Sequence, residues 1–292
     1  MSAILEVNGL AKKYPKSDFS LHDISFSLPK GSIMGFIGEN GAGKTTTINC
    51  VLGTLIKDSG SVKMFGREVS DNDMDIRNDI GVVFDENAFG GYLTATNIAS
   101  VMRSIYSNWD DALFASYLEK FKLPAKKKIK TFSRGMTMKL SLAAALSHHP
   151  KLLILDEATG GLDPVLRDDV LELFLDFVQD GNRSIFLSSH ITTDIEKIAD
   201  YVTFIHDGKI VLSSTKDELA NCYGVMRCDT SQFENIDRDD IVSYRKRINK
   251  IDVLISNKTV ARSKYHNVVI DDIPIEEIML MIIKGENDHE QK

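Results

Sequence analysis

Short apolar runs separated by polar segments predict strands that alternate with helices along the chain. Four runs are nearly continuous, which is typical of strands buried on both faces. They span residues 33–37, 80–84, 152–155 and 184–187. Residues 19–28 instead alternate apolar and polar side chains, as in a half-buried strand of an antiparallel pair, and residues 4–10 form a mixed strand pattern. These patterns predict an α/β fold with a mainly parallel sheet and an antiparallel β layer.

Helical periodicity marks three further parts of the chain. They are a short helix at 46–52, an all-helical insert at 94–147 and an amphipathic helix at 165–178. Asp207-Gly208 is a strong turn signal between two strand patterns, 201–205 and 209–212, and predicts a hairpin.

The character of the sequence changes after Leu219. Short strand patterns at 250–255 and 267–270, a helix after Pro274 and a polar end at 285–290 indicate a separate small α/β unit. The predicted organisation is a main domain at 1–220, with a helical subdomain at about 93–148, and an appendage at 221–292 with a frayed tail.

Residues 38–45, Gly-Glu-Asn-Gly-Ala-Gly-Lys-Thr, fill every fixed position of the phosphate-binding pattern G-x-x-x-x-G-K-[ST]. A predicted strand precedes them and a predicted helix follows. The glycines allow successive backbone N–H groups to point at one anion, with the positive helix end behind them. Lys44 adds a charge near the β- and γ-phosphates, and Thr45 can ligate Mg²⁺. The alternative, a glycine turn that opens an ordinary helix, leaves the lysine and threonine in register unexplained.

Charged and polar residues follow three of the buried strands. Asp156 and Glu157 end the strand at 152–155, where a buried charge is costly unless it meets a cation. The acidic loop 85–87 and the polar residues 188–190 end two other strands. Strand ends are a common place for function in α/β sheets, so we expect an ion at this edge.

Composition narrows the class of protein. The chain has 292 residues, 43% of them hydrophobic, which is enough for a sizeable core. A net charge of −7 without a long basic block disfavours a dedicated nucleic-acid binder. Three scattered cysteines and a start without a secretion signal favour reduced thiols in the cytosol. No run approaches the roughly 18 apolar residues of a spanning helix, so another chain would have to cross any membrane.

The order of these motifs resembles the ATP-binding subunit of an ABC transporter over about residues 3–220. Residues 131–136 stand where that family carries its LSGGQ signature, and 152–157 matches its Walker B strand. The remaining matches are Gly160-Gly161-Leu162-Asp163 with the D-loop, His190 with the switch histidine, Tyr14 with the adenine-stacking aromatic and Asp85 with the Q-loop position. Taken from the residues alone, Tyr14 could equally plug the end of a strand.

The resemblance implies ATP and Mg²⁺ as ligands and assigns roles to individual residues. Catalysis would fall to Glu157 as the base, with His190 and Lys44. Nucleotide contacts would come from Tyr14, Gly38, Asn40, Gly41, Gly43, Lys44, Thr45, Thr46, Ser133 and Gly135, and metal contacts from Thr45, Asp156 and Asp85. The family pattern further implies an ATP-sandwich homodimer, because the signature of one subunit closes over the phosphate on the other. It also implies a separate membrane permease and a place at the cytoplasmic face of the cell membrane.

Four residues depart from the family pattern. Asp85 replaces the usual glutamine, which leaves open whether it contacts Mg²⁺, water or the membrane partner. Arg134 and Met136 replace a glycine and a glutamine of the signature, and Ala158 replaces a proline. These variants are similar to those of single-domain bacterial exporter ATPases that have a C-terminal appendage, including the ATPases of exporters of amphipathic or antimicrobial peptides.

Two other functions are compatible with a nucleotide-binding loop. A soluble ABC ATPase that acts on ribosomes or DNA usually has two cassettes or a long coiled-coil insertion, and this chain has one cassette and a short insert. A regulatory module without turnover is disfavoured because Lys44, Asp156, Glu157 and His190 are all present. We also expect a membrane partner to dock between loop 85–89 and the helical insert, unless Phe89 and Tyr92 merely cap the core.

Overall fold

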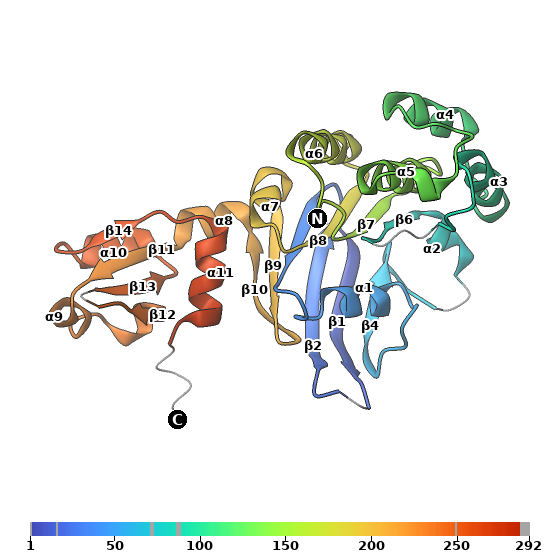
Figure 1. The fold of residues 1–292 in the computed structure, drawn as a ribbon. Coiled ribbons are helices and arrows are strands. Elements are labelled where there is room, and N and C mark those ends of the chain that lie inside the picture. Colours follow the sequence, from blue (N-terminus) through green and yellow to red (C-terminus); the bar gives the residue numbers. More distant parts are fainter. Residues whose placement is uncertain (1, 16, 71–72, 86–88, 249, 287–292) are drawn as a thin grey trace. The chain divides into compact units, whose positions relative to one another are not determined.

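The computed structural model describes residues 2–15, 17–70, 73–85, 89–248 and 250–286 (Figure 1). The chain divides into two compact units, residues 1–210 and 211–292. The sequence predicts this boundary near residue 220, which is about ten residues later in the chain and lies inside α8 (Lys216–Cys222).

A six-stranded sheet forms the centre of the first unit, with the strand order β10-β9-β3-β8-β7-β6, and its edge strand β10 continues past residue 210. Its strands are β3 (Ile33–Ile37), β6 (Ile80–Val83), β7 (Leu152–Asp156), β8 (Ser184–Ser189), β9 (Tyr201–His206) and β10 (Lys209–Thr215). Adjacent strands from β9 to β6 are parallel, and every residue of β3, β7 and β8 is buried. The hairpin turn lies at Asp207 and Gly208, both with positive φ, as the sequence predicts.

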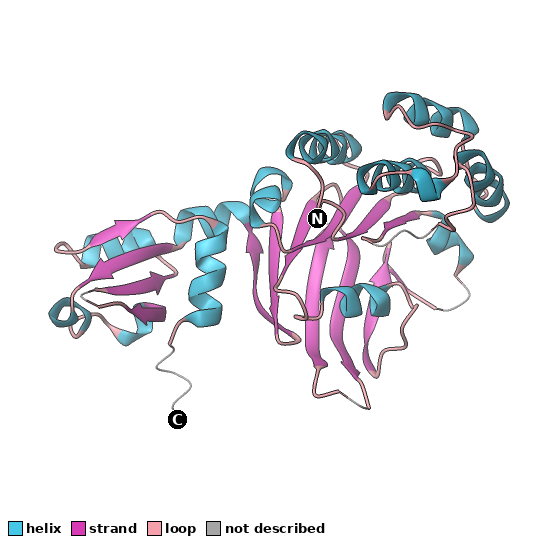
Figure 2. Ribbon diagram, viewed as in Figure 1, coloured by secondary structure: helices cyan, strands magenta, loops and turns pink. Residues whose placement is uncertain are grey.

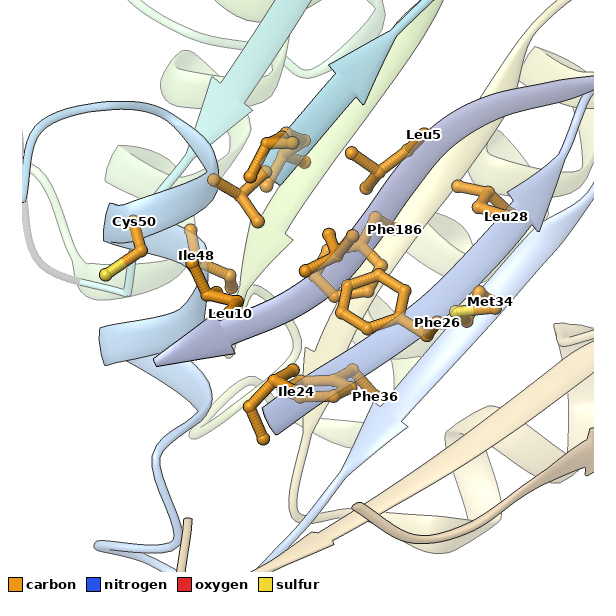
Figure 3. Close-up of a cluster of buried hydrophobic side chains, with 14 of the residues drawn as sticks. Leu5, Leu10, Ile24, Phe26, Leu28, Met34, Phe36, Ile48, Cys50 and Phe186 are labelled. Carbon is orange, nitrogen blue, oxygen red and sulfur yellow. The ribbon is translucent and has the colours of Figure 1, made fainter. Parts of the chain in front are cut away.

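An antiparallel sheet with the order β2-β1-β4-β5 covers one face of this centre. Its strands are β1 (Ala3–Lys13), β2 (Ser20–Pro29), β4 (Ser59–Met64) and β5 (Arg67–Glu68). Side chains of both sheets and of α1 (Lys44–Val51) meet in one apolar cluster, shown in Figure 3. Phe26 of β2 stacks on Phe186 of β8 at a centroid distance of 5.1 Å. This core fixes the start of α1 between the two sheets.

Helices complete the first unit (Figure 2). They are α2 (Met74–Asn78), α3 (Ala95–Ile105), α4 (Asp111–Lys120), the 3-10 turn η1 (Ile129–Thr131), α5 (Arg134–Leu146), α6 (Pro164–Val178) and α7 (Thr192–Ile198). The three helices α3 to α5 pack around their own apolar cluster, which confirms the predicted all-helical insert. On the face of β3 opposite the antiparallel layer, Gly35 lies so close to Ile195 of α7 that a Cβ would meet it at 2.4 Å.

The second unit has an antiparallel sheet with the order β12-β13-β11-β14. Its elements are α8, β11 (Gly224–Cys228), α9 (Thr230–Phe233), η2 (Arg238–Asp240), β12 (Ile241–Lys246), β13 (Ile251–Ile255), α10 (Lys258–Lys264), β14 (Val269–Asp271) and α11 (Ile275–Lys284). The strand at 250–255 and the helix after Pro274 are confirmed, whereas β11, β12 and α10 escape the sequence analysis. Residues 287–290 of the predicted frayed tail lie outside the described residues. The predicted fold class is confirmed in all its parts.

Candidate functional site

The phosphate-binding loop joins β3 to α1. Gly41 and Gly43 have φ values of 86° and 115°, which favour glycine. A Cβ on Gly43 would also lie 2.6 Å from Leu21 Cδ2, so the loop has no space for a side chain there. The loop borders a pocket of 390 Å³, lined by Phe19, Asn40, Gly41, Gly43, Lys44, Thr45, Thr46 and Glu157. Six of the predicted nucleotide contacts therefore share this pocket.

Lys44 is held inside the loop and is only 6% exposed. Its ammonium donates to the carbonyls of Gly38 at 2.7 Å and Glu39 at 3.1 Å. The same ammonium lies 3.1 Å from Oε1 of Glu157. A buried cation with two carbonyl acceptors and one carboxylate is ready to exchange a partner for a phosphate oxygen.

Thr45 and Asp156 come together from α1 and the end of β7. The Thr45 hydroxyl donates to Oδ2 of Asp156 at 2.8 Å, and the Ser188 hydroxyl donates to Oδ1 at 2.5 Å. Asp156 is 5% exposed, so both carboxylate oxygens are oriented by hydroxyls within the protein. Among the described residues no cluster of three or more His, Cys, Asp or Glu side chains forms a metal site. A hydroxyl and one carboxylate nevertheless fit Mg²⁺, which commonly takes its other ligands from water and substrate phosphates.

Glu157 follows Asp156 in the left-handed region, with φ 53°. Its Oε2 lies 2.6 Å from Nδ1 of His190, the residue that follows β8. Its Oε1 is buried and forms an ion pair with the Lys44 ammonium. The Ser188 hydroxyl also accepts from the Glu157 N–H at 3.2 Å. One carboxylate oxygen is therefore held by imidazole, and the other is paired with an ammonium that a phosphate could take over.

Tyr14 lines a second, more open pocket beside the phosphate loop. This pocket is lined by Tyr14, Pro15, Ser17, Phe19 and Thr46. Phe19 and Thr46 line both pockets, and the Tyr14 and Phe19 rings are 6.5 Å apart. Continuity of the two pockets suits a ligand that has a flat ring at one end and phosphates at the other.

The signature segment lies elsewhere in the chain. Ser133 caps α5 by accepting from the Met136 N–H at 3.2 Å, and a Cβ on Gly135 would lie 2.5 Å from Leu166 Cδ2. Neither Ser133 nor Gly135 is among the described residues that line the phosphate pocket. Asp85 pairs with Arg134, and both line a separate pocket of 310 Å³. The carboxylate of Asp85, a candidate metal ligand, is therefore already paired with the Arg134 guanidinium.

Sequence reasoning missed two residues of the site. Ser188 orients both Asp156 and the Glu157 backbone, and its only signal is its place in the polar end of a buried strand. Phe19 lines both the phosphate-loop pocket and the pocket beside Tyr14, and its alternating strand pattern signals packing rather than ligand contact.

Comparison with known proteins decides the family. Residues 21–160 match the family model described as ABC transporter. The bacitracin transport ATP-binding protein BcrA of Bacillus licheniformis is 37% identical over 221 residues, which cover 75% of this chain and 72% of that protein. The chain belongs to the ABC transporter family. The lantibiotic transport ATP-binding protein SrtF of Streptococcus pyogenes is 35% identical over 220 residues, which cover 75% of this ABC protein and 93% of SrtF.

Solved structures agree with this assignment. An ATP-binding subunit of an ABC transporter superposes with a TM-score of 0.67 at 26% identity, covering 74% of this chain and 91% of that one. A dimeric ATP-binding cassette bound to ADP and Pi superposes with a TM-score of 0.65 at 20% identity, over 72% of this chain and 98% of its own, and shows the shared fold. The protein is thus an ABC ATPase that binds and hydrolyses ATP as the ATP-binding subunit of a transporter.

Proposed function

We propose that this ABC ATPase powers the export of antimicrobial compounds, peptides among them, through a separate membrane permease. The observation that carries the proposal is the set of curated relatives. The names of three of them describe bacitracin transport, lantibiotic transport and linearmycin resistance. The last of these, LnrL of Bacillus subtilis, is 34% identical over 76% of this chain. No helix among the described residues is long and apolar enough to cross a membrane. A permease and a place at the cytoplasmic face of the membrane therefore belong to the proposal.

For hydrolysis we assign the base role to Glu157. Once a phosphate replaces Glu157 as the partner of Lys44, the buried Oε1 would be free to accept a proton from an attacking water, and His190 would orient the carboxylate through Oε2. Lys44 and the loop amides would bind the phosphates, and Tyr14 would stack on the adenine. Bound Mg²⁺ would neutralise charge between the β- and γ-phosphates, and Thr45 and Asp156 are the residues that would hold it. A direct metal contact by Asp85 would require it to leave Arg134.

The proposed active form is a homodimer. Ser133 and Gly135 carry the signature chemistry, yet they lie outside the phosphate pocket of their own chain. Two head-to-tail copies related by a two-fold axis would bring each signature to the other's nucleotide and form two equivalent sites.

The proposed docking surface for the permease is the exposed side of the helical insert. Tyr92 is 77% exposed and lies near Lys130, whose ammonium is 4.9 Å from the ring centroid. Phe89 instead packs against the apolar cluster of the insert, so it supports the surface from inside. Glu86, Asn87 and Ala88 of the expected docking loop lie outside the described residues.

Co-purification from membranes tests the proposal. The tagged protein is solubilised in mild detergent, and we expect an integral membrane protein to accompany wild-type protein and to be lost with Tyr92→Ala. Ile56→Ala is the matched control, because Ile56 is 82% exposed and lies outside the insert. Cells that express the wild-type protein together with the co-purified membrane protein should tolerate more of a lantibiotic or bacitracin than cells that express Glu157→Gln with the same membrane protein. Ribosomes or DNA in place of a membrane protein would contradict the proposal and support the soluble alternative.

A further inference from the structure

Arg134 connects three segments of the ABC ATPase domain. It is the first residue of α5, and its guanidinium Nη2 pairs with Oδ1 of Asp85, just after β6. The same guanidinium lies against the turn that follows β7. A Cβ on Gly161 would lie 2.7 Å from Nη1 and 2.8 Å from Cζ of Arg134, and Gly161 itself has φ 68°. The turn is therefore shaped to accept the arginine and has no space for a side chain at that position.

The turn that Arg134 contacts also carries Glu157. The Gly160 N–H donates to the Glu157 carbonyl at 3.0 Å, which closes the turn. A Cβ on Gly160 would lie 3.9 Å from Arg134 Nη2 and 3.9 Å from His190 Cε1. Arg134 and His190 thus approach the same glycine, and His190 also holds the Glu157 carboxylate. A shift of Arg134 would open space beside the turn and loosen the backbone that aims Glu157.

We propose that Arg134 is a positioning residue for ATP hydrolysis. Its ion pair with Asp85 fixes the guanidinium against the Gly160-Gly161 turn and so holds Glu157 in place. This inference rests on the proposed role of Glu157 as the base. The two side chains are 54% and 44% exposed, so their ion pair contributes little to folding stability. Its loss should instead appear in turnover, because small misplacements of a catalytic group are costly to rate.

A double-mutant cycle in the full chain tests this inference. Asp85→Asn, Arg134→Gln and the double variant are compared for kcat, for KM of ATP and for melting temperature. We expect each single change to lower kcat by about fivefold or more. KM should stay within about twofold, because substrate binding is unchanged. The double variant should be no slower than the slower single variant, because the two residues act as one unit.

The ion pair of Arg103 with Asp111 supplies the matched control. It has similar exposure, 56% and 53%, and lies between α3 and α4 of the insert. Arg103→Gln and Asp111→Asn should therefore leave kcat and KM unchanged.

Three outcomes would overturn the inference. In the first, Asp85→Asn keeps the wild-type kcat while Arg134→Gln is slow, so that Arg134 acts without Asp85. In the second, the two effects multiply as independent losses. In the third, kcat falls in step with the melting temperature, which indicates a structural role. Glu157→Gln is assayed in parallel. If this variant retains turnover, the base role of Glu157 fails whatever the double-mutant cycle shows. If it loses turnover but Asp85 and Arg134 show no coupling, only the role of Arg134 fails.

Discussion

Replacing Glu157 by glutamine should separate ATP binding from ATP hydrolysis. The amide keeps the shape of the side chain, so the contacts to His190 and Lys44 lose charge rather than position. It cannot accept a proton from water, and positioned general bases contribute about 10² to 10⁴ in rate. We therefore expect kcat to fall by about one-hundredfold or more.

The same change should strengthen the binding of ATP. In the structure Oε1 of Glu157 lies 3.1 Å from the Lys44 ammonium and pairs with it. The phosphates of ATP need the same ammonium, so Glu157 competes with them. Two unit charges at that distance attract by about 5 kcal/mol at an effective dielectric constant of 20, before desolvation is subtracted. Desolvation cancels most of this attraction for a buried pair, so about 1 kcal/mol remains for ATP to overcome. Glutamine removes that competition, and we expect Kd to fall by about fivefold.

Phosphate release at saturating ATP measures kcat, and isothermal titration calorimetry measures Kd. Light scattering with ATP present should show a lasting dimer. Glu172→Gln is the matched control, because Glu172 is exposed on α6 and the change is chemically the same. The reasoning is refuted if Glu157→Gln keeps turnover within about tenfold of wild type, below the usual contribution of a general base. It is refuted as well if ATP binds more weakly than to wild type.

Three further predictions concern the rest of the chain. Tyr14→Ala should weaken ATP binding by about 1–2 kcal/mol, the scale of stacking on a base, while Tyr14→Phe should be nearly silent in a binding titration; equal losses would implicate the hydroxyl. A Ser133→Arg chain mixed with a Lys44→Ala chain should recover partial hydrolysis, because both lesions fall in one composite site and leave the other intact; no recovery would mean that each chain builds its own site. Burial raises the pKa of the Cys228 thiol to about 11, so it stays neutral at pH 8. Maleimide labelling read by mass spectrometry should then modify the partly exposed Cys222 before Cys228, and the reverse order would contradict the packing of the appendage.

The central sheet could be predicted because its strands are buried on both faces. The residues of β3, β7 and β8 must then be apolar along their length, apart from the polar ends that reach the site. The phosphate loop could be predicted because its fixed residues are consecutive in the chain, and the backbone amides that face the anion come from that same short segment. Both features leave their mark directly in the order of residue types.

The appendage was harder to predict because charge lies within its sheet. Asp252 of β13 is 1% exposed, yet Arg227 of β11 and Arg247 beside β12 neutralise it. Arg227 is 25 residues from Asp252 in the sequence, so the strand patterns considered alone give no sign that these two charges pair. The alternation that would reveal β11 and β12 is interrupted by residues that only the folded chain can pair.

The same limit applies to the signature segment and explains its departures from the family pattern. In the sequence, Asp85 and Arg134 are two separate replacements of neutral residues, each of which weakens the match. In the structure they form one ion pair, so the two replacements cancel in charge. A carboxylate alone at position 85 would stand at the end of β6 without a cation, and an arginine alone would lie against the Gly160-Gly161 turn without an anion to fix it. The two departures are therefore better understood as one change, which replaces neutral contacts beside the Glu157 turn with a charged one.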